Sequence, residues 1–325
     1  MTDTIRWGIL GAGRIATSFC DDLALLDDHD VVAAGSRSPG GADEFAARFD
    51  ARPHGSWQAL VEDPDVDVVY VATPHSAHHA AALTALRAGK PVLVEKPFTM
   101  DAAQARELVA AAEASGVFLM EAMWTRFLPA VVALREVVAE GRLGDLVAVH
   151  ADFGVALPDD PEDRWFSPAL GGGALLDLGV YPVSFASMLL GTPAHVLAAS
   201  DTTSTGVDSQ TSAILRDGHG RHALVSTTML ANSETRATVV GRDARIEVDR
   251  PFFRTLGFTL VYADDTPERV ERPFEGNGMR FEAMEVARCL REGLRESPVM
   301  PLAETVTIME TLDEIRRQIG LVYPA

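Results

Sequence analysis

Lysine is rare in this chain, because only Lys90 and Lys96 among its 28 basic residues are not arginine. Lys96 follows the apolar run 92–94 and lies in the sequence Glu95-Lys96-Pro97. A lysine ammonium is a compact point charge whose pKa responds to its surroundings, whereas a guanidinium stays charged and planar. Lys96 is therefore our first candidate for hydrogen bonding to a substrate oxygen. The alternative is a chance lysine on a solvated edge, and we assign no chemistry to Lys90.

A tyrosine and an aspartate form a second candidate group, in the run LGGGALLDLGVY at residues 170–181. Asp177 and Tyr181 are four residues apart, so on a helix they lie on one face, one turn from each other. The three preceding glycines let the backbone approach another group closely. A phenol has a reference pKa of about 10, which a nearby ammonium would lower toward the range useful for proton exchange. The alternative is a hydrogen-bonded pair in the core.

A glycine-rich turn, GAGRIA at residues 11–16, follows the first predicted strand and opens the first predicted helix. Gly11 permits the tight turn, Gly13 lets the backbone approach a pyrophosphate, and Ala16 takes the small position where helix and strand pack. The amides at the helix N-terminus favour phosphate. Strand, turn and helix come in the order that dinucleotide binding requires, and the alternative is a purely structural turn.

The residues after the second predicted strand indicate which dinucleotide is bound. An acidic residue there would hold the ribose 2′-hydroxyl of NAD, but this chain has Ser36-Arg37-Ser38. An arginine with two hydroxyls suits a 2′-phosphate, so the sequence favours NADP over NAD. The alternative is that Arg37 is a solvated loop residue.

Residues 1–123 alternate β-rich runs with helical patterns, which indicates a parallel sheet covered by helices. Strands are expected at 5–10, 31–36, 66–72, 91–95 and 117–121, and helices at 14–26, 41–49, 76–88 and 101–115. Asp101 is the expected N-cap of the last helix, and Gly116 follows its end. Lys96 then lies just past the carboxyl end of a strand, on the rim where open α/β sheets bind ligands.

After residue 123 the pattern changes to strands without intervening crossover helices. A helix at 128–140 precedes expected strands at 145–156, 194–202, 209–216, 221–230, 235–240, 245–249 and 256–262, and helices at 280–293 and 303–319 close the chain. The run DGHG at 217–220 predicts a hairpin. The predicted fold class is α/β, with an N-terminal Rossmann dinucleotide-binding domain at 1–123. A C-terminal α+β domain at 124–325, with a large, mainly antiparallel open sheet, would serve substrate binding and dimerisation.

Composition limits the possible partners and compartments. The net charge of −19 opposes binding to nucleic acid or to an anionic membrane surface. Cys20 and Cys289, without CxxC spacing, and the absence of a signal-peptide pattern favour a cytoplasmic location. The longest apolar run, 171–191, contains Asp177 and three leading glycines, so we expect a buried helix rather than a membrane span.

These motifs together resemble the Gfo/Idh/MocA family of NAD(P)-dependent oxidoreductases. The resemblance covers nearly the whole chain and rests on residues 11–16, 72–75 with His78, 95–97 and 171–181. The runs EKPFTMDAAQARELV and FLMEAMWTRF resemble more specifically the branch of dimeric dihydrodiol dehydrogenases and NADP-dependent D-xylose dehydrogenases. Many family members carry histidine where Tyr181 stands. In having tyrosine there, this chain resembles the dihydrodiol dehydrogenase branch.

The resemblance implies roles for individual residues. Lys96 and Tyr181 are implied to be catalytic, and Asp177 to assist them. The residues implied to surround the cofactor are Gly11, Gly13, Arg14, Ile15, Ser36, Arg37, Thr73, Pro74, His75, Glu95, Lys96, Pro97, Trp124 and Arg164. Those expected to contact the substrate are Phe153, Trp165, Asp177 and Tyr181.

The predicted activity is reversible hydride transfer between NADP and a polyhydroxylated substrate, either an aldose such as D-xylose or D-glucose or a vicinal trans-diol. The alternative is a non-catalytic NADP-binding redox sensor or regulator of the same fold. His75, His78 and His79 have the spacing of a metal cluster on one helix face. No carboxylate or thiol partner is indicated near them and hydride transfer needs no metal, so we expect no metal.

We also expect a homodimer or a higher homo-oligomer. The second domain's sheet has one face for its helices and another that needs cover. Alternating residues of the run 221–230, including Ala223, Val225 and Met229, are expected to form this apolar outer face.

Overall fold

The structure is a computed structural model that describes residues 4–36, 40–158 and 160–324. The chain divides into two compact units. The first unit extends to Trp124 and includes residues 275–306, and the second unit comprises residues 125–274 and the chain from Thr307 onward. Each unit has its own sheet and its own core.

The described residues of the first unit contain one six-stranded parallel sheet, in the order β3-β2-β1-β4-β5-β6. Its strands are β1 (Ile5–Leu10), β2 (His29–Gly35), β3 (Arg52–His54), β4 (Val68–Val71), β5 (Val92–Glu95) and β6 (Leu119–Ala122). The strand order reverses between β1 and β4, and α/β sheets bind ligands at the carboxyl ends of strands at such a reversal. The predicted Rossmann arrangement is confirmed.

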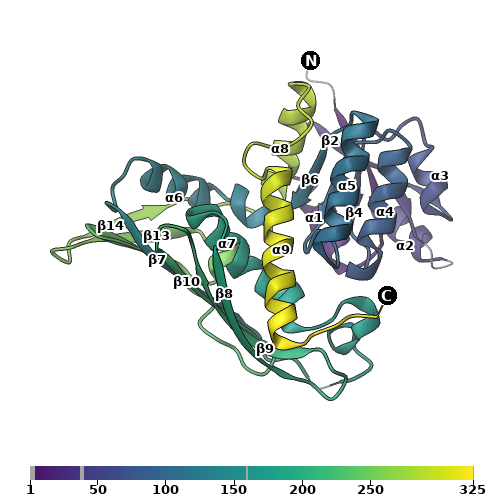
Figure 1. Ribbon diagram of the computed structural model, residues 1–325. Coiled ribbons are helices and arrows are strands. Elements are labelled where there is room, and N and C mark those ends of the chain that lie inside the picture. Colours follow the sequence, from purple (N-terminus) through teal and green to yellow (C-terminus); the bar gives the residue numbers. More distant parts are fainter. Residues whose placement is uncertain (1–3, 37–39, 159, 325) are drawn as a thin grey trace. The chain divides into compact units, whose positions relative to one another are not determined.

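The first unit contains six α-helices among its described residues, besides the start of the helix Leu302–Ile319. They are α1 (Arg14–Leu23), α2 (Gly41–Arg48), α3 (Trp57–Val61), α4 (His75–Arg87), α5 (Ala102–Ser115) and α8 (Arg280–Arg291). The sequence predicts α1, α2, α4 and α5 as part of this domain. Helices α3, α4 and α5 lie side by side, and α1 contacts α8 (Figure 1). The Asp101 carboxylate accepts a hydrogen bond from the Gln104 amide at 2.8 Å, and Gly116 ends α5 at a φ of 68°. The predicted N-cap and C-terminal glycine are confirmed.

The sequence does not predict β3 and α3. None of the three residues of β3 is buried, so it lacks the apolar alternation that identifies a strand. Helix α3 is five residues long and begins where the Ser56 hydroxyl accepts a hydrogen bond from the Ala59 amide. So short a helix falls below the window in which helical periodicity is visible.

Residues 275–306 belong to the first unit, whereas the predicted second domain spans all of 124–325. The carboxylate of Asp22, in α1, is buried and accepts hydrogen bonds from the amides of Asn277 at 2.6 Å and Met279 at 2.7 Å. These amides precede α8, so Asp22 caps a helix that is distant in sequence. Such a cap leaves no local pattern, which explains the difference.

The described residues of the second unit contain one eight-stranded sheet, in the order β14-β13-β12-β11-β7-β10-β9-β8. Its strands are β7 (Leu146–Gly154), β8 (His195–Thr202), β9 (Asp208–Arg216), β10 (His222–Thr228), β11 (Ala237–Gly241), β12 (Ala244–Val248), β13 (Gly257–Tyr262) and β14 (Pro267–Glu271). Neighbours pair antiparallel except β7 and β10, which are parallel. The mainly antiparallel sheet and the β9–β10 hairpin are confirmed, whereas the sequence does not predict β14.

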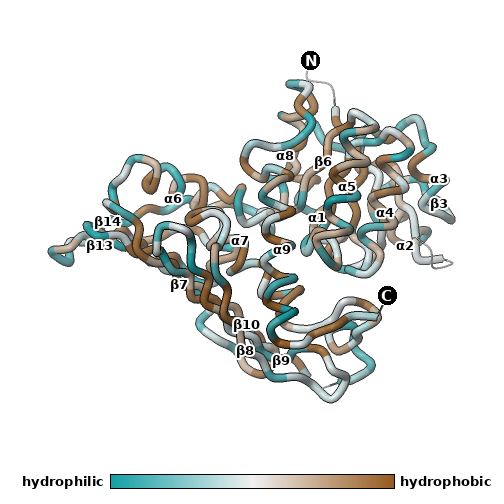
Figure 2. Tube along the Cα trace, in the orientation of Figure 1, coloured by the Kyte–Doolittle hydropathy of each residue, from teal (hydrophilic) through white to brown (hydrophobic). Residues whose placement is uncertain are grey.

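The helical part of the second unit includes α6 (Pro129–Ala139), a π-helical turn η4 (Leu175–Gly179), α7 (Val180–Leu190) and the end of α9 (Leu302–Ile319). Helix α7 packs on β7 and β10, and Figure 2 shows apolar residues along all three. The segment 168–190 is long and apolar enough to cross a membrane. However, 89% of its 18-residue apolar window is buried inside the protein. The core helix of a folded unit has the same properties, as the sequence analysis expects.

The expected outer face of this sheet is wrong by one residue. Ala223, Val225 and Met229 are 1%, 6% and 1% exposed, so they face the helices that cover the sheet. Side chains alternate between the two faces of a strand, and the alternation alone does not say which set is covered.

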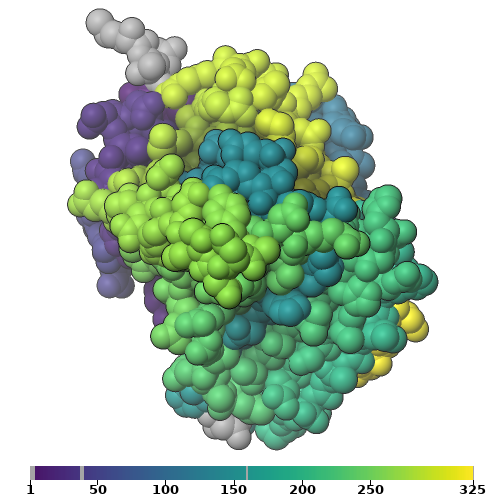
Figure 3. All heavy atoms as spheres, turned by 90° about the vertical axis from the view of Figure 1, so that its left-hand side faces the viewer, coloured from purple at the N-terminus to yellow at the C-terminus, as the bar shows by residue number. Residues whose placement is uncertain are grey.

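The uncovered face instead carries an apolar row formed by Leu197, Ile214 and Leu224, which are 66%, 41% and 45% exposed. Leu197 lies opposite Ile214 across β8 and β9, and Ile214 lies opposite Leu224 across β9 and β10. We call these three residues the outer row. Green atoms of these strands lie open on the face that Figure 3 shows.

Strand β8 lies at one edge of the same sheet. The Gln318 side chain from α9 accepts a hydrogen bond from the Ala198 amide at 3.0 Å and donates one to the Val196 carbonyl at 2.7 Å. A side-chain amide therefore satisfies backbone groups that another strand would otherwise pair with.

Candidate active site

The glycine turn between β1 and α1 has the geometry that a pyrophosphate requires. Gly11 has a φ of 108°, and a Cβ there would lie 2.4 Å from the Ala72 carbonyl oxygen. Gly13 is the N-cap of α1, and a Cβ there would meet nothing within 4 Å. The first turn of α1 contains Arg14 and Ile15 and no acidic residue, so nothing there opposes an anion.

The loop after β4 contributes Thr73, Pro74 and His75. Thr73 is 9% exposed, and its hydroxyl has no hydrogen-bond partner among the described residues. Pro74 is the N-cap of α4, and His75 is buried at its first position. A buried hydroxyl of this kind is the group that a bound ligand would satisfy.

His78 joins this loop to the lysine loop. It is 1% exposed, and its ring nitrogens lie 2.8 Å from the Pro97 carbonyl oxygen and 2.9 Å from that of Thr73. Burial, together with nearby His75, lowers the pKa of His78 to about 3. The ring is therefore neutral near pH 7 and donates to one carbonyl at a time. Among the described residues no histidine, cysteine or acidic group forms a metal site.

Glu95 holds the backbone at the candidate lysine. Its carboxylate accepts hydrogen bonds from the Tyr70 hydroxyl at 2.5 Å and from the Lys96 amide at 3.0 Å. Tyr70 is fully buried, and burial followed by the charge of Glu95 raises its pKa well above the usual range. Lys96 is half-buried just past β5, and its peptide bond to Pro97 is cis.

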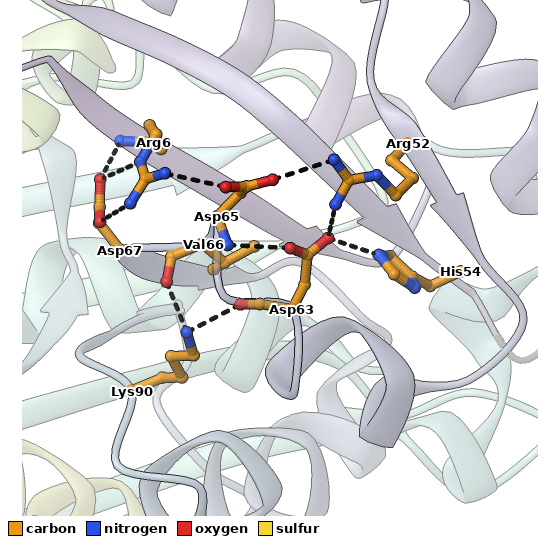
Figure 4. A network of polar contacts seen from close by, with 8 residues as sticks. All are labelled: Arg6, Arg52, His54, Asp63, Asp65, Val66, Asp67 and Lys90. Atoms are coloured by element: carbon orange, nitrogen blue, oxygen red, sulfur yellow. Dashed lines mark hydrogen bonds and ion pairs between the residues drawn. The ribbon is translucent and has the colours of Figure 1, made fainter.

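Lys90 provides an internal comparison. Its ammonium donates to the carbonyl oxygens of Asp63 at 2.9 Å and Val66 at 2.6 Å, beside a network of arginines and aspartates (Figure 4). These contacts fix the loop before β4. Lys90 therefore has a structural role, which the sequence does not predict.

In the second unit, Arg164, Trp165 and Asp177 lie together. An Arg164 guanidinium nitrogen lies 2.8 Å from an Asp177 carboxylate oxygen, whose side chain is 4% exposed. The same guanidinium stands 4.3 Å from the centre of the Trp165 ring. This arrangement fixes Asp177 in η4 as a hydrogen-bonded carboxylate.

Tyr181 lies one residue into α7 within an aromatic cluster. Its ring centre is 5.5 Å from that of Phe153 and 5.4 Å from that of Phe253, and those two phenylalanines stack at 4.5 Å. The Phe253 carbonyl accepts a hydrogen bond from the Thr125 hydroxyl at 2.8 Å. Such a cluster can hold the apolar face of a substrate beside the phenol.

The structure places most predicted site residues on two sets of elements. The first unit carries the glycine turn, the loops after β4 and β5, and Ser36 at the end of β2. Trp124 belongs to the first unit, where it is 6% exposed, and Arg164 belongs to the second. Arg37 lies outside the described residues, so its predicted contact with the 2′-phosphate stays a prediction.

The sequence analysis does not identify Phe253, Tyr70 or Asp208. Phe253 lies in a segment without regular pattern, two residues after Pro251, and Tyr70 has the pattern of an ordinary apolar strand residue. Asp208 is fully buried and accepts a hydrogen bond from the Leu175 amide. An acidic residue at the start of an otherwise alternating strand is the one signal that points to it.

Sequence models of two domains match the chain. The model described as the oxidoreductase family with an NAD-binding Rossmann fold matches residues 5–123, and the GFO/IDH/MocA C-terminal domain matches residues 131–247. The chain belongs to the Gfo/Idh/MocA oxidoreductase family. The resemblance stated from the motifs is therefore confirmed.

Similar proteins within this family have named activities. The chain is 40% identical to a D-xylose 1-dehydrogenase (NADP(+)) of Hypocrea jecorina, over 99% of this chain and 93% of that protein. It is 41% identical to a trans-1,2-dihydrobenzene-1,2-diol dehydrogenase of Mus musculus, over 98% of each.

Solved structures of the family have the same fold. A 3-ketoreductase from Actinomadura kijaniata, in complex with NADP and TDP-benzene, matches with a TM-score of 0.86 at 27% identity over 98% of each chain. An aldose-aldose oxidoreductase from Caulobacter crescentus, complexed with glycerol, matches with a TM-score of 0.89 at 25% identity, again over 98% of each chain. These matches favour an oxidoreductase over a non-catalytic sensor.

Proposed function

We propose that this protein is an NADP-dependent dehydrogenase that oxidises a CH–OH group of a polyhydroxylated substrate, an aldose such as D-xylose or a vicinal trans-diol. The proposal rests on two observations, one in each unit. The first unit carries a glycine turn at the N-terminus of α1 together with Lys96 after β5, and the second carries Asp177 in η4 and Tyr181 in α7. The printed activities of the xylose and dihydrodiol dehydrogenases support the substrate class.

The residues present fit NADP. Gly11 and Gly13 leave the backbone open beside the N-terminus of α1, where a pyrophosphate is stabilised by the amides. The Thr73 hydroxyl, which lacks a partner among the described residues, is available to the ribose or the nicotinamide side of the dinucleotide. Ser36 and Arg37 would receive the 2′-phosphate.

When bound, NADP supplies the hydride acceptor at its nicotinamide ring. Tyr181 takes the proton of the reacting hydroxyl, and the Lys96 ammonium polarises the same oxygen and favours the phenolate. Asp177, fixed by Arg164, orients a hydroxyl of the substrate or Tyr181 itself. The aromatic rings of Phe153 and Trp165 exclude water from the apolar side of the substrate.

Steady-state kinetics of Lys96→Ala and Tyr181→Phe test these roles. We expect kcat to fall by about 10²- to 10⁴-fold in each, the range for a lost acid–base group. Lys90→Ala is the matched control, because it removes the chain's other lysine from a structural site and should leave kcat near wild type. Wild-type turnover in both site variants would exclude the assignment.

The cofactor preference has its own test. Arg37→Ala should raise the KM for NADP by about tenfold or more while leaving the KM for NAD nearly unchanged, because only NADP carries the 2′-phosphate. An equal change for both cofactors would show that Arg37 does not read the phosphate.

The sensor alternative makes a different prediction from the dehydrogenase. Absorbance of the nicotinamide band, followed with NADP and a panel of aldoses and diols, should show turnover with at least one of them. Tight binding of NADPH without turnover of any substrate would favour the sensor.

We propose further that two copies of the chain pair through the outer row. Leu197, Ile214 and Leu224 are exposed side by side and line a hollow of about 690 Å³ on the uncovered sheet face. A contiguous apolar surface of this kind is typical of an interface. Light scattering should give a dimer mass for the wild type and for Leu256→Asp, an exposed leucine outside the row, and a monomer mass for Leu224→Asp.

A cytoplasmic location is also a proposal. Cys20 and Cys289 are both buried as free thiols, which suits a reducing compartment. Fractionation of cells that express the tagged protein would test it, and recovery outside the cytoplasm would contradict it.

A further inference from the structure

Asp208 is a buried carboxylate in the second unit to which the proposed reaction assigns no role. It begins β9 and is 0% exposed. One carboxylate oxygen accepts hydrogen bonds from the Leu175 amide at 2.8 Å and from the Thr211 hydroxyl at 2.7 Å. Leu175 is the first residue of η4, so Asp208 holds the start of the turn that carries Asp177.

The other oxygen of Asp208 faces the glycine run. It has no hydrogen-bond partner among the described residues, and a Cβ on Gly173 would lie 2.3 Å from it. Gly173 has a φ of 114°, which favours glycine, and the absence of a side chain makes room for the carboxylate. The glycine run and Asp208 are therefore fitted to each other.

Tyr323, near the end of the chain, holds the same run from another direction. Its hydroxyl donates a hydrogen bond to the Gly172 carbonyl at 2.6 Å. Burial, followed by the charge of Asp208, raises the pKa of Tyr323 far above its usual range, so the phenol stays protonated and remains a donor. Two buried polar groups thus fix the segment that leads into η4.

We propose that Asp208 is a positioning residue, which orients Asp177 and Tyr181 through its hydrogen bond to the first residue of η4. The proposal rests on the proposed dehydrogenase function. Asp177 lies two residues beyond Leu175, and Tyr181 lies in the first turn of the helix that continues η4. A displacement of about 1 Å at a reacting group can lower a rate by about a hundredfold, so the start of the turn matters for catalysis.

The protonation state of Asp208 provides a specific readout. Burial raises its pKa to about 6, while the hydrogen bonds from Thr211 and Leu175 oppose the rise. The titratable side chain that faces it from the C-terminal segment is Tyr323, whose own charged neighbours are Arg316 and Asp177. Hydrogen bonds to a carboxylate are stronger than those to its neutral form, so protonation loosens the start of η4.

The test is the pH profile of kcat in four proteins. Wild-type kcat should fall by about fivefold as the pH drops through the pKa of Asp208, because charge-assisted bonds become neutral ones. Asp208→Asn should show the lower rate throughout and lack this acidic limb. Thr211→Val, which removes one donor, should move the limb upward by about one pH unit. Asp201→Asn, an exposed aspartate that bonds Gln210, should behave as wild type.

Two further measurements separate a positioning role from a general loss of structure. Asp208→Ala should lower kcat by about a hundredfold while the Kd for NADPH stays near wild type. Its amide hydrogen exchange should increase in residues 171–181 and remain unchanged in the first unit. Wild-type kcat and exchange in Asp208→Ala, or an unshifted limb in Thr211→Val, would overturn the proposal. Absence of turnover in the wild type would instead refute the proposed function, and the exchange result would still decide the role of Asp208.

Discussion

At the scale of single residues, the glycine turn shows that two glycines of one motif have different physical reasons to be there. Gly11 has a positive φ, and the Ala72 carbonyl lies so close to it that a side chain would not fit. Gly13 has an ordinary φ of −87° and open space around it. The fold therefore requires Gly11 to be glycine, whereas nothing in the fold requires it at Gly13, where we propose that a phosphate lies.

We expect Gly11→Ala and Gly13→Ala to fail in different ways. Gly11→Ala should lower the free energy of unfolding by about 1–3 kcal/mol, because its Cβ is both strained and crowded. Gly13→Ala should change that free energy by less than about 1 kcal/mol, yet raise the Kd for NADPH by about tenfold or more. Urea unfolding and fluorescence titration measure the two effects. NADPH binding by Gly13→Ala with wild-type affinity would show that no phosphate lies against this glycine.

Tyr70→Phe tests the support beneath Lys96. The change leaves a buried Glu95 oxygen without its phenol donor, so we expect a loss of about 1–3 kcal/mol in the free energy of unfolding. Tyr262→Phe is the control, because its bond to Glu268 is partly exposed and worth less. An equal loss in the free energy of unfolding of the two variants would mean that the buried hydrogen bond stabilises the protein no more than the partly exposed one.

At the scale of elements, helix α8 illustrates how a distant side chain decides where a segment packs. Its start is capped by Asp22, and its side chains pack against α1. In the same helix, Glu282 is fully buried, and burial together with the charges of Glu95, Asp22 and Glu121 raises its pKa. The raised pKa favours a form of Glu282 that repels these acidic groups less, where α8 packs close to them.

Removing the cap should loosen α8 alone. Asp22→Ala leaves the amides of Asn277 and Met279 without their acceptor, which should lower the free energy of unfolding by about 1–2 kcal/mol. Hydrogen exchange should increase first in α8. Asp21→Ala removes an adjacent, exposed carboxylate that bonds Arg48, and it should have little effect. Comparable losses for the two variants would contradict the cap.

Local patterns were sufficient to predict the elements that carry the site. Strand β1 has the predicted bounds, and the glycine turn and Lys96 lie at the predicted strand ends. Tyr181 lies in a helix as predicted, whereas Asp177 lies in the π-helical turn before it. Contacts between distant segments left no such pattern. The cap from Asp22 to α8 and the bond from Asp208 to Leu175 join residues far apart, and only the folded chain brings them together.

The wrong prediction of the sheet's outer face has a different cause from these missed contacts. Along β10, Ala223 and Val225 alternate with His222, Leu224 and Ser226, so the first set is the more apolar one. Helix α7 packs on the smaller residues and leaves Leu224 uncovered. The buried set is the one that the alternation within the strand favours, and the expectation assigned it to the wrong face.

At the scale of the whole molecule, stability depends on pH wherever a buried carboxylate has a different pKa in the folded and unfolded chain. Asp208 has a pKa of about 6 in the folded protein, above its unfolded value of about 3.9. Its contribution to stability is therefore fully present below about pH 4 and is lost as the pH rises through 6.

Asp208→Asn should abolish this dependence. Between pH 4 and pH 7.5 the free energy of unfolding of the variant should rise relative to wild type by about 3 kcal/mol, which follows from the pKa difference. Urea titrations at both pH values measure the change. A constant difference across this range would show that Asp208 has an ordinary pKa in the folded protein.

The pairing of Gln318 with strand β8 also limits how copies of the protein can assemble. The carbonyl of Val196 and the amide of Ala198 are already engaged, so this part of the edge cannot pair with an extended segment from another molecule. The association that we propose uses the outer row and not this edge. A self-complementary face of this kind is fully covered once two molecules bind. At this edge the protein is therefore protected against open-ended fibres, although the sheet itself is broad and apolar.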